Sequence, residues 1–153
     1  VEAKSLNTVK SAILVEGGVV QIIAPRLGML KAADQSEIAV DESFLTAASV
    51  LYDAVYIPGG INSIDTLKID ANAIHFLNEA FKHCKAIAAD DRAIEVLKAT
   101  YFSKDLPKEF SDETVLEEGL IMGSNATSLA KQFIKAISQH RFWNREKPRK
   151  VPA

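Results

Sequence analysis

The sequence predicts an α/β fold, a doubly wound and mostly parallel sheet in a flavodoxin-like three-layer sandwich. Short apolar runs rich in Val, Ile and Ala alternate with segments of helical period, and strands separated by helices indicate parallel βαβ units. The runs are continuously apolar rather than alternating, as expected for strands covered on both faces. The 153 residues, 48% of them hydrophobic and 25% charged, are enough for one hydrophobic core.

The first third of the chain predicts a helix, a strand and a short β-excursion. Apolar residues at helical spacing are followed by a glycine pair that ends the pattern: Leu6, Val9, Ile13, Leu14 and Gly17-Gly18. The run VVQIIA (19–24), ended by Pro25, predicts a buried strand. Residues 27–44 lack a helical period and predict a β-excursion with a turn near Asp34-Gln35.

The remainder predicts three more strands and three helices. LYDAVYIPGG (51–60) is typical of a buried strand with a Pro-Gly-Gly turn, and KAIAAD (85–90) and EGLIMG (118–123) of two others. Residues 91–99 predict a helix, and Ser124 or Asn125 a cap for the last one. The other helical stripes are Ile74, Leu77, Phe81 and Cys84, and Leu129, Phe133, Ala136 and Ile137. Residues 100–118 give no clear pattern, although Pro107 excludes one long helix there.

The order of these elements begins with a helix, whereas an α/β domain of this kind normally begins with a strand. In the flavodoxin-like strand order the first strand lies inside the sheet. Its loss exposes the edges of two neighbouring strands. We therefore expect that the first strand is missing from this chain.

Charge is distributed unevenly. The net charge is −2, but the segment 141–150 carries five basic residues against Glu146 alone, a balance of +4 that leaves −6 for the rest. We expect an α/β domain over 1–143 and a basic C-terminal tail over 144–153. A tail of five cations without a recognised binding fold is a weak nucleic-acid signal, so we expect it to lie on an acidic surface of its own assembly. Its interaction residues would be Arg141, Trp143 and Arg145.

Compartment and membrane signals are few. The chain lacks a run of 18 apolar residues, and its N-terminus lacks a signal-peptide pattern. The single cysteine, Cys84, excludes an internal disulfide and agrees with a reducing compartment. We expect a cytoplasmic protein without a membrane partner. Cys84 lies on the inner stripe of its helix, which favours packing over nucleophilic chemistry.

The pair Asp90-Asp91 lies where a strand gives way to a helix, the place where α/β folds put nucleophiles and ligands. Acid–base chemistry is one interpretation, but adjacent side chains diverge, and capping of the helix is favoured. Gly59-Gly60 lacks the phosphate-binding motifs and indicates a tight turn. No H-x-x-x-H or C-x-x-C pair indicates a metal site. The three histidines, expected at the surface or beside it, are His75, His83 and His140.

Taken together, LYDAVYIPGG, LNEAFKHCKAIAAD and EEGLIMG followed by HRFWNREKPRKVPA resemble the C-terminal domain of large-subunit haem catalases of the hydroperoxidase II type. The similarity spans nearly the whole chain, and its ending, from His140 to Ala153, is the most specific part. The domain is also similar to the PfpI and class I amidotransferase superfamily. Active members of that superfamily carry a cysteine on the turn that here reads Asp90-Asp91, and an acid in the first helix near the position of Ser5.

The resemblance implies a non-catalytic accessory domain that serves stability, assembly or substrate access. We then expect no catalytic, cofactor-binding or metal-binding residues in this chain. The turn at Asp90-Asp91 would be a degenerate form of the superfamily's active-site turn, without the nucleophile. Haem, and the conversion of hydrogen peroxide to water and oxygen, would belong to the parent enzyme. The partners would be the catalase barrel and neighbouring subunits of a homo-oligomer, without nucleic acid. Two alternatives remain: a stand-alone PfpI-type hydrolase or glyoxalase-like enzyme, and a chaperone-like interaction domain.

Overall fold

A four-stranded sheet forms the centre of the protein. The computed structural model describes residues 1–108, 113–116 and 118–146. The strand order is β5-β6-β8-β7, in which β5, β6 and β8 are parallel and β7 pairs antiparallel with β8. These strands are β5 (Ala54–Ile57), β6 (Ala86–Asp90), β7 (Glu113–Val115) and β8 (Leu120–Gly123).

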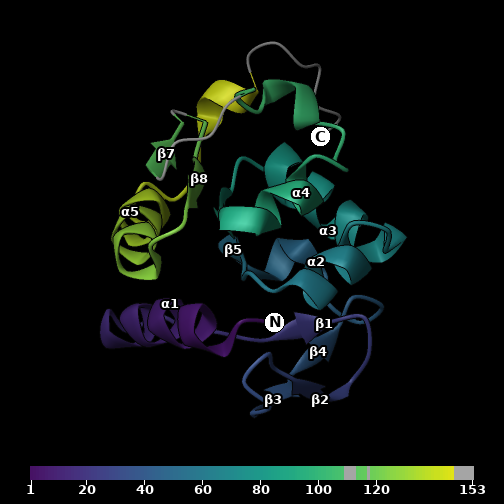
Figure 1. The fold of residues 1–153 in the computed structure, drawn as a ribbon. Coiled ribbons are helices and arrows are strands. Elements are labelled where there is room, and N and C mark those ends of the chain that lie inside the picture. Colours follow the sequence, from purple (N-terminus) through teal and green to yellow (C-terminus); the bar gives the residue numbers. More distant parts are fainter. Residues whose placement is uncertain (109–112, 117, 147–153) are drawn as a thin grey trace.

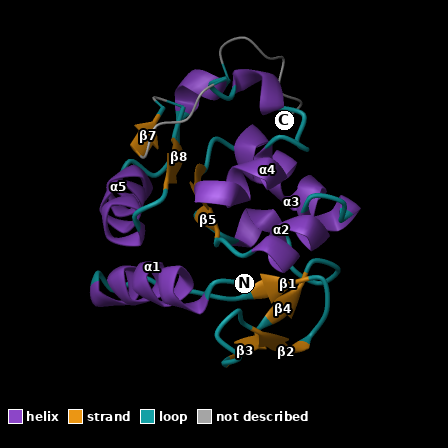
Figure 2. Ribbon diagram, viewed as in Figure 1, coloured by secondary structure: helices purple, strands orange, loops and turns teal. Residues whose placement is uncertain are grey.

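Helices cover both faces of this sheet (Figures 1 and 2). On one face Val9 of α1 (Ala3–Val15) and Phe133 of α5 (Ala126–Ser138) pack with Ala88 and Ile121. On the other face Ile64, Leu77 and Leu97 pack with Ile87 and Leu120. They come from α2 (Ile61–Leu67), α3 (Ala71–Lys82) and α4 (Ile94–Leu97). The expected α/β three-layer sandwich is thereby confirmed.

The segment between α1 and β5 forms two small sheets beside the main one (Figure 1). β2 (Gly28–Lys31) and β3 (Glu37–Val40) form an antiparallel hairpin, and Gln35 adopts a φ of 70° in its turn. This confirms the β-excursion. β1 (Ile23–Ala24) pairs in parallel with β4 (Glu42–Ser43).

The predicted buried strand over 19–24 is only partly correct. Ile23 and Ala24 alone are in a strand, and Val19 is 88% exposed. The main sheet of described residues does not include this segment. Residues 19–22 of this run therefore lie outside the strands that the structure describes.

Local signals account for most element boundaries. Asn125 caps α5 by accepting from the backbone N–H groups of Thr127 and Ser128, as expected. Asp70 caps α3 in the same way. The predicted helix over 91–99 is present as a 3-10 turn (η2, Asp91–Ala93) followed by α4. The sequence reading missed α2, whose seven residues are too few to show a helical period.

Three further 3-10 turns complete the described chain: η1 (Ser49–Leu51), η3 (Ser103–Asp105) and η4 (Trp143–Arg145). None of the described helices is both long and apolar enough to cross a bilayer.

Candidate functional site

The strand-to-helix turn at Asp90 and Asp91 separates the two carboxylates. Asp90 ends β6 and is 4% exposed. Its Oδ1 accepts from the N–H of Asp91 at 3.1 Å, and its Oδ2 accepts from the N–H of Gly59 at 3.3 Å. Asp91 is exposed. Asp90 therefore caps η2 and ties the turn after β5 to the turn after β6, which is the capping geometry expected for it.

A second acid approaches the same turn, and the sequence reading did not identify it. A Cβ placed on Gly59 would lie 3.1 Å from Asp90 Oδ2 and 3.2 Å from Glu2 Oε2. The N–H of Glu2 also donates to the carbonyl of Gly59 at 2.8 Å. Both carboxylates thus converge on a glycine that leaves room for them. The position of Glu2 at the start of α1 was the signal available in the sequence.

Ser5 and Tyr56 lie behind these acids. Ser5 is buried in α1, and its hydroxyl donates to the carbonyl of Glu2 at 3.4 Å. The Tyr56 hydroxyl of β5 is buried and forms no hydrogen bond of ordinary geometry with the described residues. Burial, above all, raises the pKa of Tyr56; the nearby Ser5 hydroxyl partly offsets this, and the charges of Asp90 and Glu2 raise the pKa further. The phenol is therefore held in its neutral form.

Cys84 lies at the opposite end of β6 from Asp90 and is 1% exposed. α3 ends at Lys82, two residues earlier than the predicted stripe. The N–H of Cys84 donates to the carbonyl of Phe81, and that of Lys85 to the carbonyl of Ala80. This is a Schellman motif with cysteine at the left-handed position, at a φ of 60°. The thiol is a packed part of a helix terminus and is remote from the carboxylate turn.

The start of the C-terminal segment packs against the domain through Phe142. Its N–H donates to the carbonyl of Cys84 at 2.7 Å, and its ring is buried in the α1–α5 layer. Gly119 makes this possible, because a Cβ there would lie 2.3 Å from the Phe142 ring. The sequence reading overlooked Phe142 and selected Trp143.

Arg145 is buried as well, with 5% of its surface exposed. Its Nη1 donates to the carbonyls of Lys85 at 2.6 Å and Phe81 at 3.3 Å. Its guanidinium carbon lies 4.4 Å from the centre of the Phe81 ring, a cation–π arrangement. Arg145, expected to be an interaction residue, therefore holds the terminal segment on its own domain.

Arg141 and Lys85 add further positive charge near this end of β6. Arg141, which precedes the tail, pairs with Asp53 at 3.6 Å, so this basic interaction residue contacts an acidic residue of the domain. The buried Lys85 amino group donates to the carbonyl of Ser49. Burial, and next the charge of Arg141, lower the pKa of Lys85, which Asp53 partly offsets.

Trp143 lies between Phe142 and Arg145, which both pack on the domain, but it remains 60% exposed. Packing against its own domain, one of the two expected docking modes, is therefore not what the structure shows. The expectations for residues 147–153, including the order of the chain past Pro148, lie outside the described residues.

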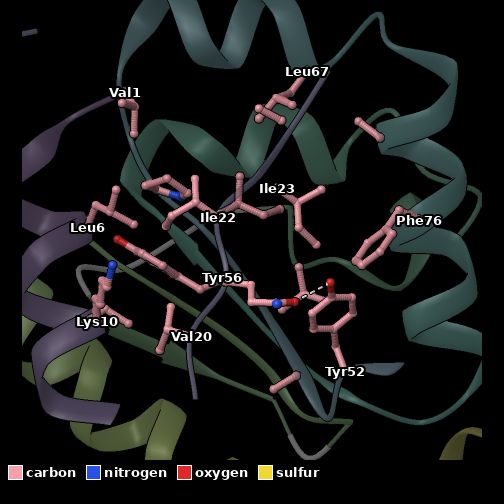
Figure 3. A pocket seen from close by; sticks show the side chains of 18 of the residues that line it. Val1, Leu6, Lys10, Val20, Ile22, Ile23, Tyr52, Tyr56, Leu67 and Phe76 are labelled. Atoms are coloured by element: carbon pink, nitrogen blue, oxygen red, sulfur yellow. Dashed lines mark hydrogen bonds between the residues drawn. The ribbon is translucent and has the colours of Figure 1, made fainter. Parts of the chain in front are cut away.

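A large cavity lies beside β5 (Figure 3). Its volume is about 860 Å³. Apolar side chains from both helix layers line it, together with residues 19–25 and β5 itself. Tyr56 projects between Leu6 and the 19–24 segment in Figure 3. Of the histidines, His75, His83 and His140 are all exposed, and the described residues contain no group of three potential metal ligands.

Comparison with known proteins gives a family match and a fold match. The family model for the C-terminal domain found in long catalases matches residues 2–147. Catalase HPII of Mycobacterium avium is 37% identical over 84% of this chain and 19% of its own length. Catalase-2 of Bacillus subtilis is 35% identical over 93% of this chain and 19% of its own length. The chain thus spans about a fifth of the relatives it matches.

Solved structures share the fold at lower identity. A two-domain protein of Anabaena variabilis, with DJ-1/ThiJ/PfpI-like and ferritin-like domains, superposes with a TM-score of 0.78. It is 22% identical, and the match covers 91% of this chain and 45% of that one. A Schizosaccharomyces pombe DJ-1 variant gives a TM-score of 0.77 at 15% identity, with coverage of 99% and 94%.

Proposed function

Because the chain belongs to the family of C-terminal domains found in long catalases, we propose that it is a non-catalytic domain that serves the assembly of a haem catalase. The parent enzyme would convert hydrogen peroxide to water and oxygen, and neighbouring subunits of a homo-oligomer would be its partners. The single cysteine of the sequence, Cys84, favours a reducing compartment such as the cytoplasm for that enzyme.

The carboxylate turn carries the non-catalytic part of the proposal. Where active relatives in the PfpI superfamily would have a thiol, Asp90 has a carboxylate held by two backbone N–H groups. Glu2 supplies an acid at the same turn, and we assign it the place of the superfamily's first-helix acid in preference to Ser5. Without that thiol, the covalent chemistry of the active superfamily members has no nucleophile at this turn.

The described residues also fit haem poorly. Catalases bind the iron through a tyrosine phenolate. Tyr52 donates its hydroxyl hydrogen to Gln21, and burial raises the pKa of Tyr56, which disfavours its phenolate. The histidines are exposed at the surface. We therefore place the haem in the rest of the parent enzyme.

The exposed indole supports a role in assembly. Phe142 and Arg145 fix the backbone on both sides of Trp143 while the indole remains in solvent. Ordering an anchored side chain costs little entropy on binding, and tryptophans of this kind are frequent energetic centres of interfaces. We propose that Trp143 contacts another part of the oligomer.

Measurements on the isolated chain and on the full-length parent test the proposal. The isolated chain, mixed with haemin, should show no Soret shift, no oxygen evolution from peroxide and no consumption of methylglyoxal. In the full-length parent, Trp143→Ala should weaken the oligomer in sedimentation velocity. Leu45→Ala, which truncates another exposed apolar side chain, should not. Turnover of methylglyoxal by the isolated chain would instead support the stand-alone enzyme. An oligomer unaffected by Trp143→Ala would remove the assigned contact.

A further inference from the structure

The two partners of the ion pair between Arg141 and Asp53 differ in exposure. The Arg141 side chain is only 16% exposed, whereas the Asp53 side chain is 74% exposed. Their N–O distance of 3.6 Å exceeds the roughly 2.7–2.9 Å of a charge-assisted hydrogen bond. The other acceptor that the described chain gives the guanidinium is the carbonyl of His140, at 2.8 Å. A largely buried cation is thus held by one long ion pair, and its capacity to bind a carboxylate is only partly used.

The charges around this pair favour an incoming anion. The buried amino group of Lys85 lies close enough to Arg141 and Asp53 for both charges to act on its pKa. Burial lowers the pKa of Lys85 most, the charge of Arg141 lowers it next, and Asp53 raises it by less. Asp53 therefore does not cancel the positive charge of Arg141 at this place. A partner that brings a carboxylate would be attracted, and one that brings a cation would be repelled.

Two turns with exposed apolar side chains flank the ion pair, and Lys85 holds both of them. Its amino group donates to the carbonyl of Ser49 in η1, and its own carbonyl accepts from Arg145 in η4. Because Asp53 follows η1 and Arg141 precedes η4, their ion pair joins the two turns. The large apolar side chains that the turns expose are Val50, Leu51 and Trp143. We call these three side chains, together with Arg141 and Asp53, the η1–η4 surface.

The composition of the η1–η4 surface selects among possible occupants. A second copy that presented the same surface would bring Arg141 towards Arg141, and like charges across an interface repel. A nucleic acid would need several cations along its phosphates. Lys85 and Arg145 cannot supply them, because both are buried and donate to carbonyl groups. A protein surface that presents a carboxylate between apolar groups fits both the arginine and the side chains around it.

We propose that the η1–η4 surface docks an acidic, apolar-flanked protein surface of the parent enzyme, and that Asp53 competes with the partner's carboxylate for Arg141. Before docking, Asp53 holds the guanidinium through a pair with one exposed member, which contributes little stability. On docking, Arg141 exchanges Asp53 for the new carboxylate, and the apolar side chains exclude water and so strengthen the new pair. This inference deepens the proposed function, on which it rests for the parent enzyme and its assembly.

The test compares two substitutions in the full-length parent enzyme. Mass photometry over a dilution series measures the dissociation constant of the oligomer, in enough urea to bring it into the measurable range. Arg141→Gln should raise this constant by about tenfold or more, because one charge-assisted contact is lost. Asp53→Asn should lower it by about threefold, because the competing carboxylate is gone. Added salt should weaken the unsubstituted oligomer more than the Arg141→Gln variant.

A second ion pair provides the matched control. Lys68 pairs with Asp65 at 2.6 Å at the end of α2, so Lys68→Gln and Asp65→Asn make the same two charge changes. Both should leave the dissociation constant unchanged. Leu51→Ser should raise the constant, whereas Ile69→Ser, at another exposed apolar position, should not. In the isolated chain each variant should melt within about 4 °C of the unsubstituted chain, because every changed group is exposed or in a weak pair.

Opposite signs for Arg141→Gln and Asp53→Asn distinguish competition from a structural role. Equal weakening by the two substitutions would overturn the proposal, and so would no change in either. A dimer of the isolated chain that Leu51→Ser abolishes would also overturn it, because a second copy would then be the occupant.

The outcome for Trp143→Ala is separate from this test. If Trp143→Ala leaves the oligomer intact while the two charge substitutions act in opposite directions, the assigned tryptophan contact fails and the carboxylate exchange stands. If Trp143→Ala weakens the oligomer while the two charge substitutions act alike, the role in assembly stands and the exchange fails.

Discussion

β6 and β5 are neighbours in register, yet their surroundings differ. All five residues of β6 are buried, and the strand has a partner on each side. Among the described strands β5 has one partner, and only Ile57 of its four residues is buried. β5 reads AVYI and β6 reads AIAAD. The second neighbouring strand of β6 covers an edge that β5 does not have covered, which contributes to the more complete burial of β6.

The difference extends to the two halves of the molecule. Around β6, the C-terminal half packs α3, α4, α5 and Phe142 into two dense clusters. Around β5, the N-terminal half leaves a cavity of about 860 Å³ and several exposed apolar side chains, among them Val15, Val19 and Leu45. We expect substitutions in the C-terminal half to cost more stability, because they remove contacts that are complete.

The largest effect is expected from a pair of truncations at register partners. Ile87 of β6 lies opposite Val55 of β5, and both pack on the same cluster. Ile87→Ala should lower the free energy of unfolding by about 2–5 kcal/mol, the usual cost of a fully buried aliphatic truncation. Val55→Ala should cost less than half as much, because its side chain is only partly buried. Urea denaturation measures both, and equal losses would contradict the proposed difference between the strands.

Gly119 tests the anchoring of the terminal segment. Gly119→Ala combines a φ of 77° with a clash against the Phe142 ring, and should cost about 2–4 kcal/mol. Gly17→Ala is the matched control, since it has a φ of 84° and open space around the new Cβ. It should cost about 1 kcal/mol from backbone strain alone. Thermal melts of the two variants separate the clash from the strain, and similar losses would mean that Phe142 moves aside freely.

The C-terminal half of the fold, around β6, was also more predictable from the sequence than the N-terminal half around β5. The stripes Leu77–Phe81 and Leu129–Phe133 predicted α3 and α5, because a helix packed on a sheet buries one face at a fixed period. The run 19–24 predicted a strand by the same logic, but a strand also needs a partner. That partner is not encoded in the run itself, so only Ile23–Ala24 pairs.

The site was predicted less well than the fold. Capping by Asp90 follows from its place between a strand and a helix. Glu2 reaches the same turn only because the start of α1 folds beside Gly59, a contact between residues far apart in sequence. In the C-terminal segment, the sequence analysis selected Trp143 as the docking residue because of its large ring. The residue that packs on the domain is Phe142, whose ring lies in the space beside Gly119. No local pattern contains that information.

A smaller loss of stability is expected from a substitution at Cys84, in the C-terminal half around β6. Cys84→Ser places a hydroxyl at a buried helix terminus and should cost about 1–2 kcal/mol. In the unsubstituted chain, a thiol reagent should label Cys84 far more slowly in the folded state than in urea. Ser138→Cys, at an exposed position of α5, is the control that should react at once. Rapid labelling of native Cys84 would contradict its burial.

The smallest effect is expected at Tyr56, in the N-terminal half around β5. Its buried hydroxyl has no hydrogen-bond partner of ordinary geometry among the described residues, so Tyr56→Phe should be neutral or stabilising by up to about 1 kcal/mol at pH 7. Tyr52→Phe removes a hydroxyl that donates to Gln21 and should cost about 0.5–1 kcal/mol.

Burial raises the pKa of Tyr56 in the folded chain. The unfolded chain therefore loses this proton first, and the stability that Tyr56 contributes is lost as the pH rises above about 10. Urea denaturation at pH 7 and pH 11 should accordingly show a smaller alkaline loss in Tyr56→Phe than in the unsubstituted chain. An unchanged alkaline loss, or a penalty at pH 7 equal to that of Tyr52→Phe, would show that water or another group pairs with the phenol and that the space beside β5 is polar.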